Sequence, residues 1–124
     1  MGSVVHYEIT ATDTARAKKF YEEALGRKIE NANMPRTDYW LTIPKGNGID
    51  GAIMPKEYNP QPVIPHVSVT DIDESIEKVK KAGGSIVNEK MNVPGVGYSI
   101  YIKDSEGNVI GLLQELEEYK KRND

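Results

Sequence analysis

The chain has 124 residues, the size of one compact domain, which leaves no room for separate cofactor and substrate lobes. With 38% hydrophobic and 28% charged residues and a net charge of −3, it has a globular balance and lacks the positive field that nucleic acids or anionic membranes require. The absence of cysteine excludes disulfides, thiolate metal ligands and cysteine nucleophiles. No apolar run approaches the roughly 20 residues of a membrane span and no signal-peptide profile is visible, so we expect a cytoplasmic protein without nucleic-acid or membrane partners.

The first half of the chain predicts a βαβββ module. β-Branched and aromatic residues indicate a strand over Val4–Thr10, and Thr12 or Asp13 can then cap a helix that ends at Gly26. Apolar residues recur at helical spacing and predict a core-facing stripe made of Ala17, Phe20, Tyr21, Ala24 and Leu25. Three strands joined by turns at 34–37 and 44–48 follow, at Arg27–Asn31, Asp38–Ile43 and Ile49–Met54.

The second half repeats this plan. A strand over Ile64–Thr70 leads to a helix that Asp73 caps, that carries Ile76 and Val79, and that stops at glycines 83 and 84. Three more strands complete the module, at Ser85–Glu89, Tyr98–Lys103 and Val109–Leu113. The tail from Glu115 to Asp124 is almost wholly charged and predicts a solvated, fraying helix, with docking onto a second subunit as the alternative.

An internal sequence repeat relates the two halves. His6 and His66 are 60 residues apart in matching strands, and Gly51 and Gly111 share this offset. The connecting segment 58–62 is too short to separate independent domains. We therefore expect a single α+β domain of eight strands and two helices, built of two repeats over about 1–58 and 63–118 that share a core, plus the charged tail.

Three features together carry a family resemblance: a histidine in each first strand, the run Ala-Arg-Ala-Lys-Lys-Phe-Tyr at 15–21, and Asp-Ser-Glu-Gly-Asn at 104–108. In this order and spacing they resemble the vicinal oxygen chelate superfamily, which includes glyoxalases, bleomycin-resistance proteins and extradiol dioxygenases. The resemblance implies curled mixed sheets that surround a small-molecule cavity, and a homodimer. In metal-dependent members, two histidines and two carboxylates hold a divalent ion.

The chain departs from that ligand set. His6 and His66 fall on the histidine positions, but Gly51 and Gly111 stand where the resemblance implies carboxylates. Two imidazoles alone would bind a divalent metal only weakly, and no cofactor is otherwise indicated. Glu8 follows His6 by two residues and so shares its face of the strand, with the Cα atoms about 6.6 Å apart. Glu8 is a candidate third ligand or catalytic general base, and equally a structural acid.

Large aromatic residues complete the predicted pocket. Trp40 and Tyr98 lie in corresponding strands and could clamp a planar ligand, although alternation leaves Tyr39 as the competitor of Trp40, and packing in the core is the alternative for both. The ligand pocket predicted in this way is lined by His6, Glu8, Trp40, His66 and Tyr98.

Three functions remain open. The first is a glyoxalase-like enzyme of the lyase, isomerase or oxygenase type with a degenerate metal site, in which Glu8 or a histidine moves a proton. The second is a non-catalytic protein that sequesters a small molecule, as antibiotic-resistance members do. The third is an oligomerisation or interaction module. Whether the protein is an enzyme is not decided by these residues.

Overall fold

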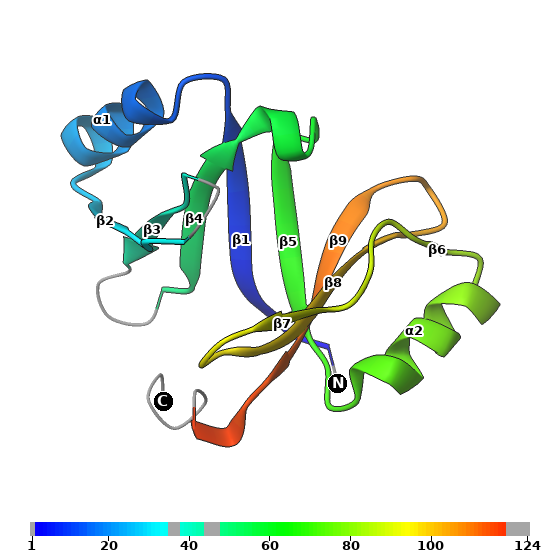
Figure 1. Cartoon of the computed structure of the whole chain (residues 1–124). Helices are drawn as coiled ribbons and strands as arrows, with labels where there is room; N and C mark the ends of the chain where they lie inside the picture. Colours follow the sequence, from blue (N-terminus) through cyan, green and yellow to red (C-terminus); the bar gives the residue numbers. More distant parts are fainter. Residues whose placement is uncertain (1, 35–37, 44–47, 119–124) are drawn as a thin grey trace. The chain divides into compact units, whose positions relative to one another are not determined.

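The computed structural model describes residues 2–34, 38–43 and 48–118 (Figure 1). The chain divides into two compact units. We call Val5–Ile64 the N-unit, and Pro65–Asp124 together with Met1–Val4 the C-unit. The prediction of an α+β chain made of two βαβββ-type modules is confirmed.

The N-unit follows the predicted order closely. Its four strands form a sheet in the order β2-β3-β4-β1, in which β1 and β4 are parallel and the other pairs are antiparallel. A short 3₁₀ turn, η1 (Lys56–Tyr58), follows β4. The main elements are β1 (Val4–Ala11), α1 (Thr14–Leu25), β2 (Lys28–Asn31), β3 (Trp40–Ile43) and β4 (Asp50–Pro55). Most of the two predicted turns, residues 35–37 and 44–47, lies outside the described residues.

Helix α1 begins and ends where the sequence predicts. The Asp13 side chain accepts a hydrogen bond from the backbone N–H of Arg16, and Gly26 ends the helix in the left-handed conformation with φ of 63°. The predicted core stripe is wrong at three of its five positions, because Phe20 is 57% and Leu25 61% exposed, and Ala24 is exposed as well. Successive helical residues are about 100° apart, so the five residues of the stripe span about 140° of the helix circumference. Ala17 and Tyr21 alone among them are half-buried, so the part of the helix that the small sheet covers is narrower than the stripe.

The C-unit contains one strand more than predicted. Its strands follow the order β5-β9-β8-β6, and β7 also pairs with β8. The predicted strand at 85–89 is cut to two residues, because Asn88 Oδ1 accepts the N–H of Tyr101 on β8 and so replaces a backbone carbonyl. Strand β9 extends to Glu115, so the tail begins later than predicted, and its residues 119–124 lie outside the described part. The elements are β5 (Val63–Ser68), α2 (Ile72–Lys81), β6 (Ser85–Ile86), β7 (Met91–Val93), β8 (Gly97–Lys103) and β9 (Val109–Glu115).

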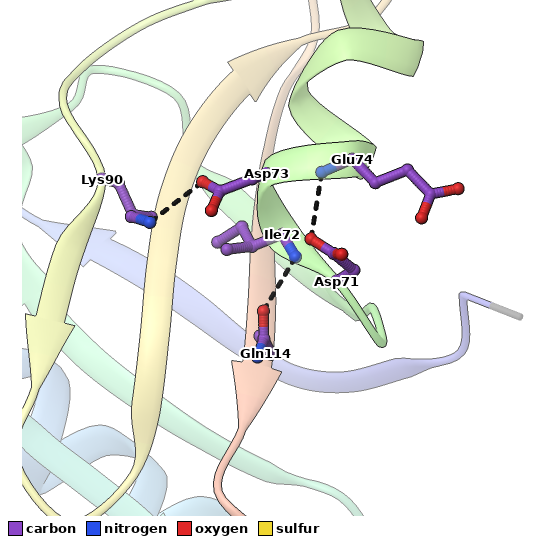
Figure 2. Close-up of polar contacts among 6 residues, drawn as sticks. All are labelled: Asp71, Ile72, Asp73, Glu74, Lys90 and Gln114. Atoms are coloured by element: carbon purple, nitrogen blue, oxygen red, sulfur yellow. Dashed lines mark hydrogen bonds and ion pairs between the residues drawn. The ribbon is translucent and has the colours of Figure 1, made fainter.

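Polar contacts fix the start of α2 (Figure 2). The cap is Asp71 and not Asp73 as predicted: the Asp71 carboxylate accepts the N–H of Glu74 at 3.1 Å. The N–H of Ile72 donates to Gln114 Oε1 on β9 at 2.8 Å, and Asp73 instead pairs with Lys90 at 2.9 Å. An earlier helix start places Ile72 in the first turn, where it is 1% exposed and anchors the core.

The hydrophobic core of the C-unit lies between α2 and one face of its sheet. Ile76 and Val79 of α2 pack against this cluster. The fully buried members are Ile72, Ile100, Ile102 and Leu112. Within the described residues, no helix has the length and apolar character needed to cross a membrane.

Candidate functional site

Strand β1 presents a polar cluster on one face. Side chains alternate along a strand, so His6 and Glu8 point to one face and Tyr7 to the other. Tyr39, directly before β3, brings its hydroxyl to this pair: it donates to Glu8 Oε2 at 2.7 Å and lies 2.9 Å from His6 Nε2. The His6 and Tyr39 rings are nearly parallel, at 18°. We call His6, Tyr39 and Glu8 the polar triad.

The two hydrogen bonds of the triad run in the same donor-to-acceptor direction. A phenol carries one hydrogen, and Tyr39 gives it to Glu8, so the phenolic oxygen is an acceptor towards His6. His6 must then carry a hydrogen on Nε2 for the 2.9 Å contact to be a hydrogen bond. Donors and acceptors therefore run in one sense, from the imidazole through the phenol to the carboxylate.

The two ends of the triad differ in solvent exposure. Glu8 is only 2% exposed, whereas His6 and Tyr39 are half-buried. A carboxylate removed from water is costly unless hydrogen bonds satisfy it, and the Tyr39 hydroxyl supplies one of these. On the neighbouring strand β4, Asp50 is the register partner of His6 and Ala52 that of Glu8. A second acid, half-buried Asp50, thus shares the face that carries the triad.

Gly51 lies on the opposite face from His6. Its register partner on β1 is Tyr7, and a Cβ on Gly51 would overlap the Tyr7 ring. The Tyr7 hydroxyl lies 2.9 Å from Thr42 Oγ1 and accepts a hydrogen bond from Arg27, just after α1, at 2.8 Å. Glycine is needed here because an aromatic ring occupies the space that any side chain would take.

Trp40, a predicted pocket residue for which packing in the core was the alternative, does not lie beside the polar triad. Its register partner is Ile53, and the ammonium of Lys18 on α1 lies 5.5 Å from the ring centroid. This places the indole on the face of the sheet that α1 covers. Tyr39, which the sequence offered as the competitor, provides the aromatic group beside His6 and Glu8. The indole Nε1 of Trp40 is buried and has no hydrogen-bond partner among the residues that the structure describes.

His66 in the C-unit is a packed side chain. It is 7% exposed, and its ring occupies the space of the missing side chain at Gly111, its register partner on β9. Tyr101 on β8 meets the imidazole edge to face, with ring centroids 5.5 Å apart. His66 and Gly111 lie away from α2, because their neighbours Val67 and Leu112 belong to the core beneath that helix.

Tyr98 lies apart from His66 within the C-unit. Tyr98 and Tyr101 are three positions apart on β8, so the two rings point to opposite faces. Tyr98 is 38% exposed, and the ammonium of Lys90 lies 5.2 Å from its ring. Tyr101 was not among the predicted site residues; its position opposite Gly111 in an antiparallel pair is the signal that could have identified it.

The described residues do not fit the family's metal centre within either unit. Among them, no three His, Asp or Glu side chains gather as a metal site. The Tyr7 and His66 rings occupy the places above Gly51 and Gly111 where ligand side chains would begin. A separate surface hollow of about 350 Å³, where β1 ends and α1 begins, is lined by Thr12, Thr14 and Lys56 among others and contains none of the predicted site residues.

Comparison with known proteins gives a consistent answer. The family model described as Glyoxalase/Bleomycin resistance protein/Dioxygenase superfamily matches residues 3–112. A "Probable lactoylglutathione lyase" of Vibrio parahaemolyticus is 26% identical over 125 residues, covering 91% of each chain. A virulence protein of Salmonella typhimurium is 29% identical over 117 residues, covering 88% of this chain and 81% of its own.

Solved structures share the fold at low sequence identity. Methylmalonyl-CoA epimerase from Mycobacterium tuberculosis matches with a TM-score of 0.72 at 16% identity, over 98% of this chain and 91% of its own. A hypothetical protein from Bacillus halodurans C-125 also has a TM-score of 0.72, at 14% identity, over 94% and 96% of the two chains. With the family model covering most of its length, the chain belongs to the glyoxalase/bleomycin resistance protein/dioxygenase superfamily.

Proposed function

We propose that the protein is an enzyme of the isomerase or lyase type, which moves a proton on a small carbonyl-containing molecule by means of the polar triad. One observation carries this proposal: a carboxylate that is 2% exposed is linked through a phenol to a half-buried imidazole, by contacts of 2.7 and 2.9 Å. A directed chain of this kind transfers protons without moving heavy atoms.

The proposed step begins at the half-buried end of the triad. The imidazole of His6 accepts a proton from a substrate carbon next to a carbonyl, and the electron pair of the broken C–H bond shifts towards the carbonyl oxygen. The Nε2 proton passes to Tyr39, and the Tyr39 proton passes to Glu8. Reversal of the transfers returns a proton to the substrate. Glu8 thus stores the proton out of reach of solvent.

Two further facts support the proposal. A relative at 26% identity carries the name lactoylglutathione lyase, so thioester- or carbonyl-related small molecules are the first substrates to try. The triad also needs no metal for its proton transfers, in keeping with described residues that do not fit the family's metal centre. A weakly bound divalent ion at His6 or His66 stays a separate proposal, to be decided by metal titration.

We propose the cytoplasm as the location of the protein.

Hydrogen exchange tests the chemistry directly. Chelator-treated protein is incubated in D2O with the hemithioacetal of methylglyoxal and glutathione, and with a panel of small ketones and ketoacids, while NMR follows loss of the C–H signal next to the carbonyl. We expect exchange with at least one compound. Glu8→Gln and Tyr39→Phe should each slow it by about 10²- to 10⁴-fold, the usual contribution of a general acid or base.

Tyr7→Phe is the matched control. Like Tyr39→Phe, it removes a tyrosine hydroxyl that has two hydrogen-bond partners. Tyr7 lies on β1, however, and points to the opposite face of the sheet from the triad. We expect it to lower stability and leave the exchange rate unchanged. Equal losses in Tyr7→Phe and Tyr39→Phe would contradict a catalytic role for the triad.

Ligand-induced thermal shifts separate catalysis from sequestration. Binding to the native state raises the unfolding temperature whether or not chemistry follows. A compound that stabilises the protein, shows no exchange and binds Glu8→Gln equally well would establish the alternative, a small-molecule binding protein. Adding Ni, Zn, Mn or Fe(II) to wild type, His6→Ala and His66→Ala in the same assay decides the metal proposal.

A further inference from the structure

The surface hollow of the N-unit lies where two parallel strands end. Ala11 is the last residue of β1 and the register partner of Pro55, the last residue of β4. Beyond these two residues the chain continues into α1 and into η1, and both connections line the hollow. Its volume of about 350 Å³ is at the lower end of the roughly 300–1,000 Å³ of ligand pockets, so it suits a small metabolite.

Three charged side chains line this hollow. Lys56 and Glu57 belong to η1, and Asp38 directly precedes Tyr39 of the polar triad. Asp38 and Glu57 are exposed, and Lys56 is half-buried. Within the described ranges of the chain, none of these three groups forms an ion pair or a side-chain hydrogen bond. Two carboxylates and one ammonium group, an excess of one negative charge, are therefore available to a ligand.

The rest of the lining supplies hydroxyl groups and apolar surface. Thr12 and Thr14 contribute hydroxyls, which can donate to a carboxylate or accept from an ammonium group. The Thr12 hydroxyl also accepts a hydrogen bond from Arg16 at 3.3 Å. Ala11 and Pro55 contribute apolar side chains that a hydrocarbon chain can cover. The hollow therefore matches a ligand that is charged at its ends and apolar in between.

We propose that this hollow binds a free basic amino acid, for which lysine is the simplest probe. The two ammonium groups of lysine face Asp38 and Glu57, and its carboxylate faces Lys56. Its methylene chain covers Ala11 and Pro55. Every charged group of the ligand then meets an opposite charge, and every charged group of the lining acquires a partner.

Other small ligands match the charges of the lining less well. A dicarboxylate or a phosphate ester pairs with Lys56 but brings negative charge to Asp38 and Glu57. A diamine pairs with both acids and leaves Lys56 facing a cation. Arg16 and Asp13 lie next to the lining and carry opposite charges, so they do not alter this balance.

Binding at this hollow should be weak and sensitive to salt. Ion pairs close to bulk water contribute little each, and two of the three charged groups are exposed. We expect a dissociation constant of about 0.1–10 mM, which rises with ionic strength. This inference does not depend on the proposed enzymatic function, because none of the triad residues lines the hollow.

Nuclear magnetic resonance titration locates the site. L-Lysine is added to the isotope-labelled full chain at low ionic strength, and the backbone amide signals are followed. We expect saturable changes in residues 11–14, 38–39 and 56–57, and none in α2 or in the β8–β9 turn. Sodium chloride at equal ionic strength should not reproduce them. No saturable change up to about 50 mM lysine, or changes centred on the C-unit, would overturn the proposal.

Ligand analogues test each charge pair separately. Norleucine is lysine without the side-chain ammonium group, and cadaverine is lysine without the carboxylate. We expect the wild type to bind each about two- to fivefold more weakly than lysine, the effect of one exposed ion pair. The preference for lysine over cadaverine should disappear in Lys56→Met. The preference over norleucine should disappear in whichever of Asp38→Asn and Glu57→Gln removes the partner of the side-chain ammonium group.

Matched controls come from the C-unit. Lys103→Met and Glu106→Gln remove exposed charges outside the hollow and should leave both preferences unchanged. Thermal unfolding curves check that every variant is folded. Preferences that survive in all the hollow variants, losses of equal size in the controls, or tighter binding of succinate or inorganic phosphate than of lysine would each overturn the proposal.

Discussion

The N-unit and the C-unit solve the same packing problem on opposite faces of their sheets. In each unit an aromatic ring on the first strand lies over a glycine on the last: Tyr7 over Gly51, and His66 over Gly111. The first contact is on the side of α1, where Arg27 reaches Tyr7, and the second is on the side away from α2. The pairing of β1 with β4 is shifted by one residue relative to the pairing of β5 with β9. Such a shift turns every side chain of one strand to the other face of the sheet, and this accounts for the difference.

The two halves also differ chemically. The 60-residue sequence repeat relates His6 to His66 and Gly51 to Gly111. Since His66 lies opposite Gly111, the repeat would place His6 opposite Gly51. The N-unit places Tyr7 there instead. The face away from α1 carries His6 and Glu8 together because they are two residues apart on β1, whereas Ser68 stands two residues after His66, whose ring meets Tyr101. The chemical difference between the halves thus comes from Glu8 in one and Ser68 in the other.

The largest expected effect comes from filling the glycine positions. Gly51→Ala and Gly111→Ala would each force a ring to move, and we expect a loss of about 1–3 kcal/mol or more in the free energy of unfolding, as for overpacked cores. Urea denaturation measures it. In the C-unit, the double variant H66A/G111A should be more stable than the sum of the single effects predicts, by about 1 kcal/mol or more. Additive losses would mean that the ring–glycine contact does not determine the stability.

The two helix caps should behave alike, despite the different sequence offsets. Asp13→Ala and Asp71→Ala each remove a carboxylate that accepts an N–H in the first turn, so each should cost about 1 kcal/mol of stability. Asp73→Ala removes only an exposed ion pair with Lys90 and should cost less. Chemical denaturation compares the three variants. A larger loss for Asp73→Ala than for Asp71→Ala would return the cap to the position predicted from the sequence.

The smallest effect is expected in the β8–β9 turn of the C-unit. The backbone N–H and side-chain amide of Asn108, with the N–H of Glu106, lower the pKa of Asp104 from its ordinary value of 3.8. A lowered pKa in the folded state means that the unfolded chain binds the proton first, so this stabilisation is full above pH 3.8 and is lost as the pH falls below it.

Asp104→Asn tests this turn. Its stability should approach that of wild type as the pH falls below the ordinary aspartate range, and should lie below wild type at neutral pH. Urea midpoints at a series of pH values provide the measurement. A constant difference between the two proteins at all pH values would exclude the ionised Asp104 as the cause.

Local sequence signals predicted the elements well, because their causes are local. Gly26 ends α1 in a conformation that glycine adopts readily, and the β-branched runs became strands. The register between β1 and β4 is different in kind, since these strands are about 40 residues apart and their alignment depends on tertiary packing. The sequence therefore identified His6 and Glu8 as neighbours but could not choose between Tyr39 and Trp40 as their aromatic partner.

The exposure of Phe20 shows a similar limit. Helical periodicity identifies which residues share a side of α1 but not how wide a side the sheet can cover. In α2 the apolar residues Ile76 and Val79 fit beneath the helix and pack against the core. How much of a helix surface the sheet covers depends on how the whole unit packs.

Trp40 has a practical consequence as the only tryptophan of the chain. Its indole is enclosed in the N-unit, near the ammonium of Lys18. Intrinsic fluorescence excited at the indole therefore reports the melting of that unit alone, while far-ultraviolet circular dichroism averages both. Superimposable curves from the two spectroscopies would mean that the halves unfold as one cooperative body, and separated curves that each melts by itself.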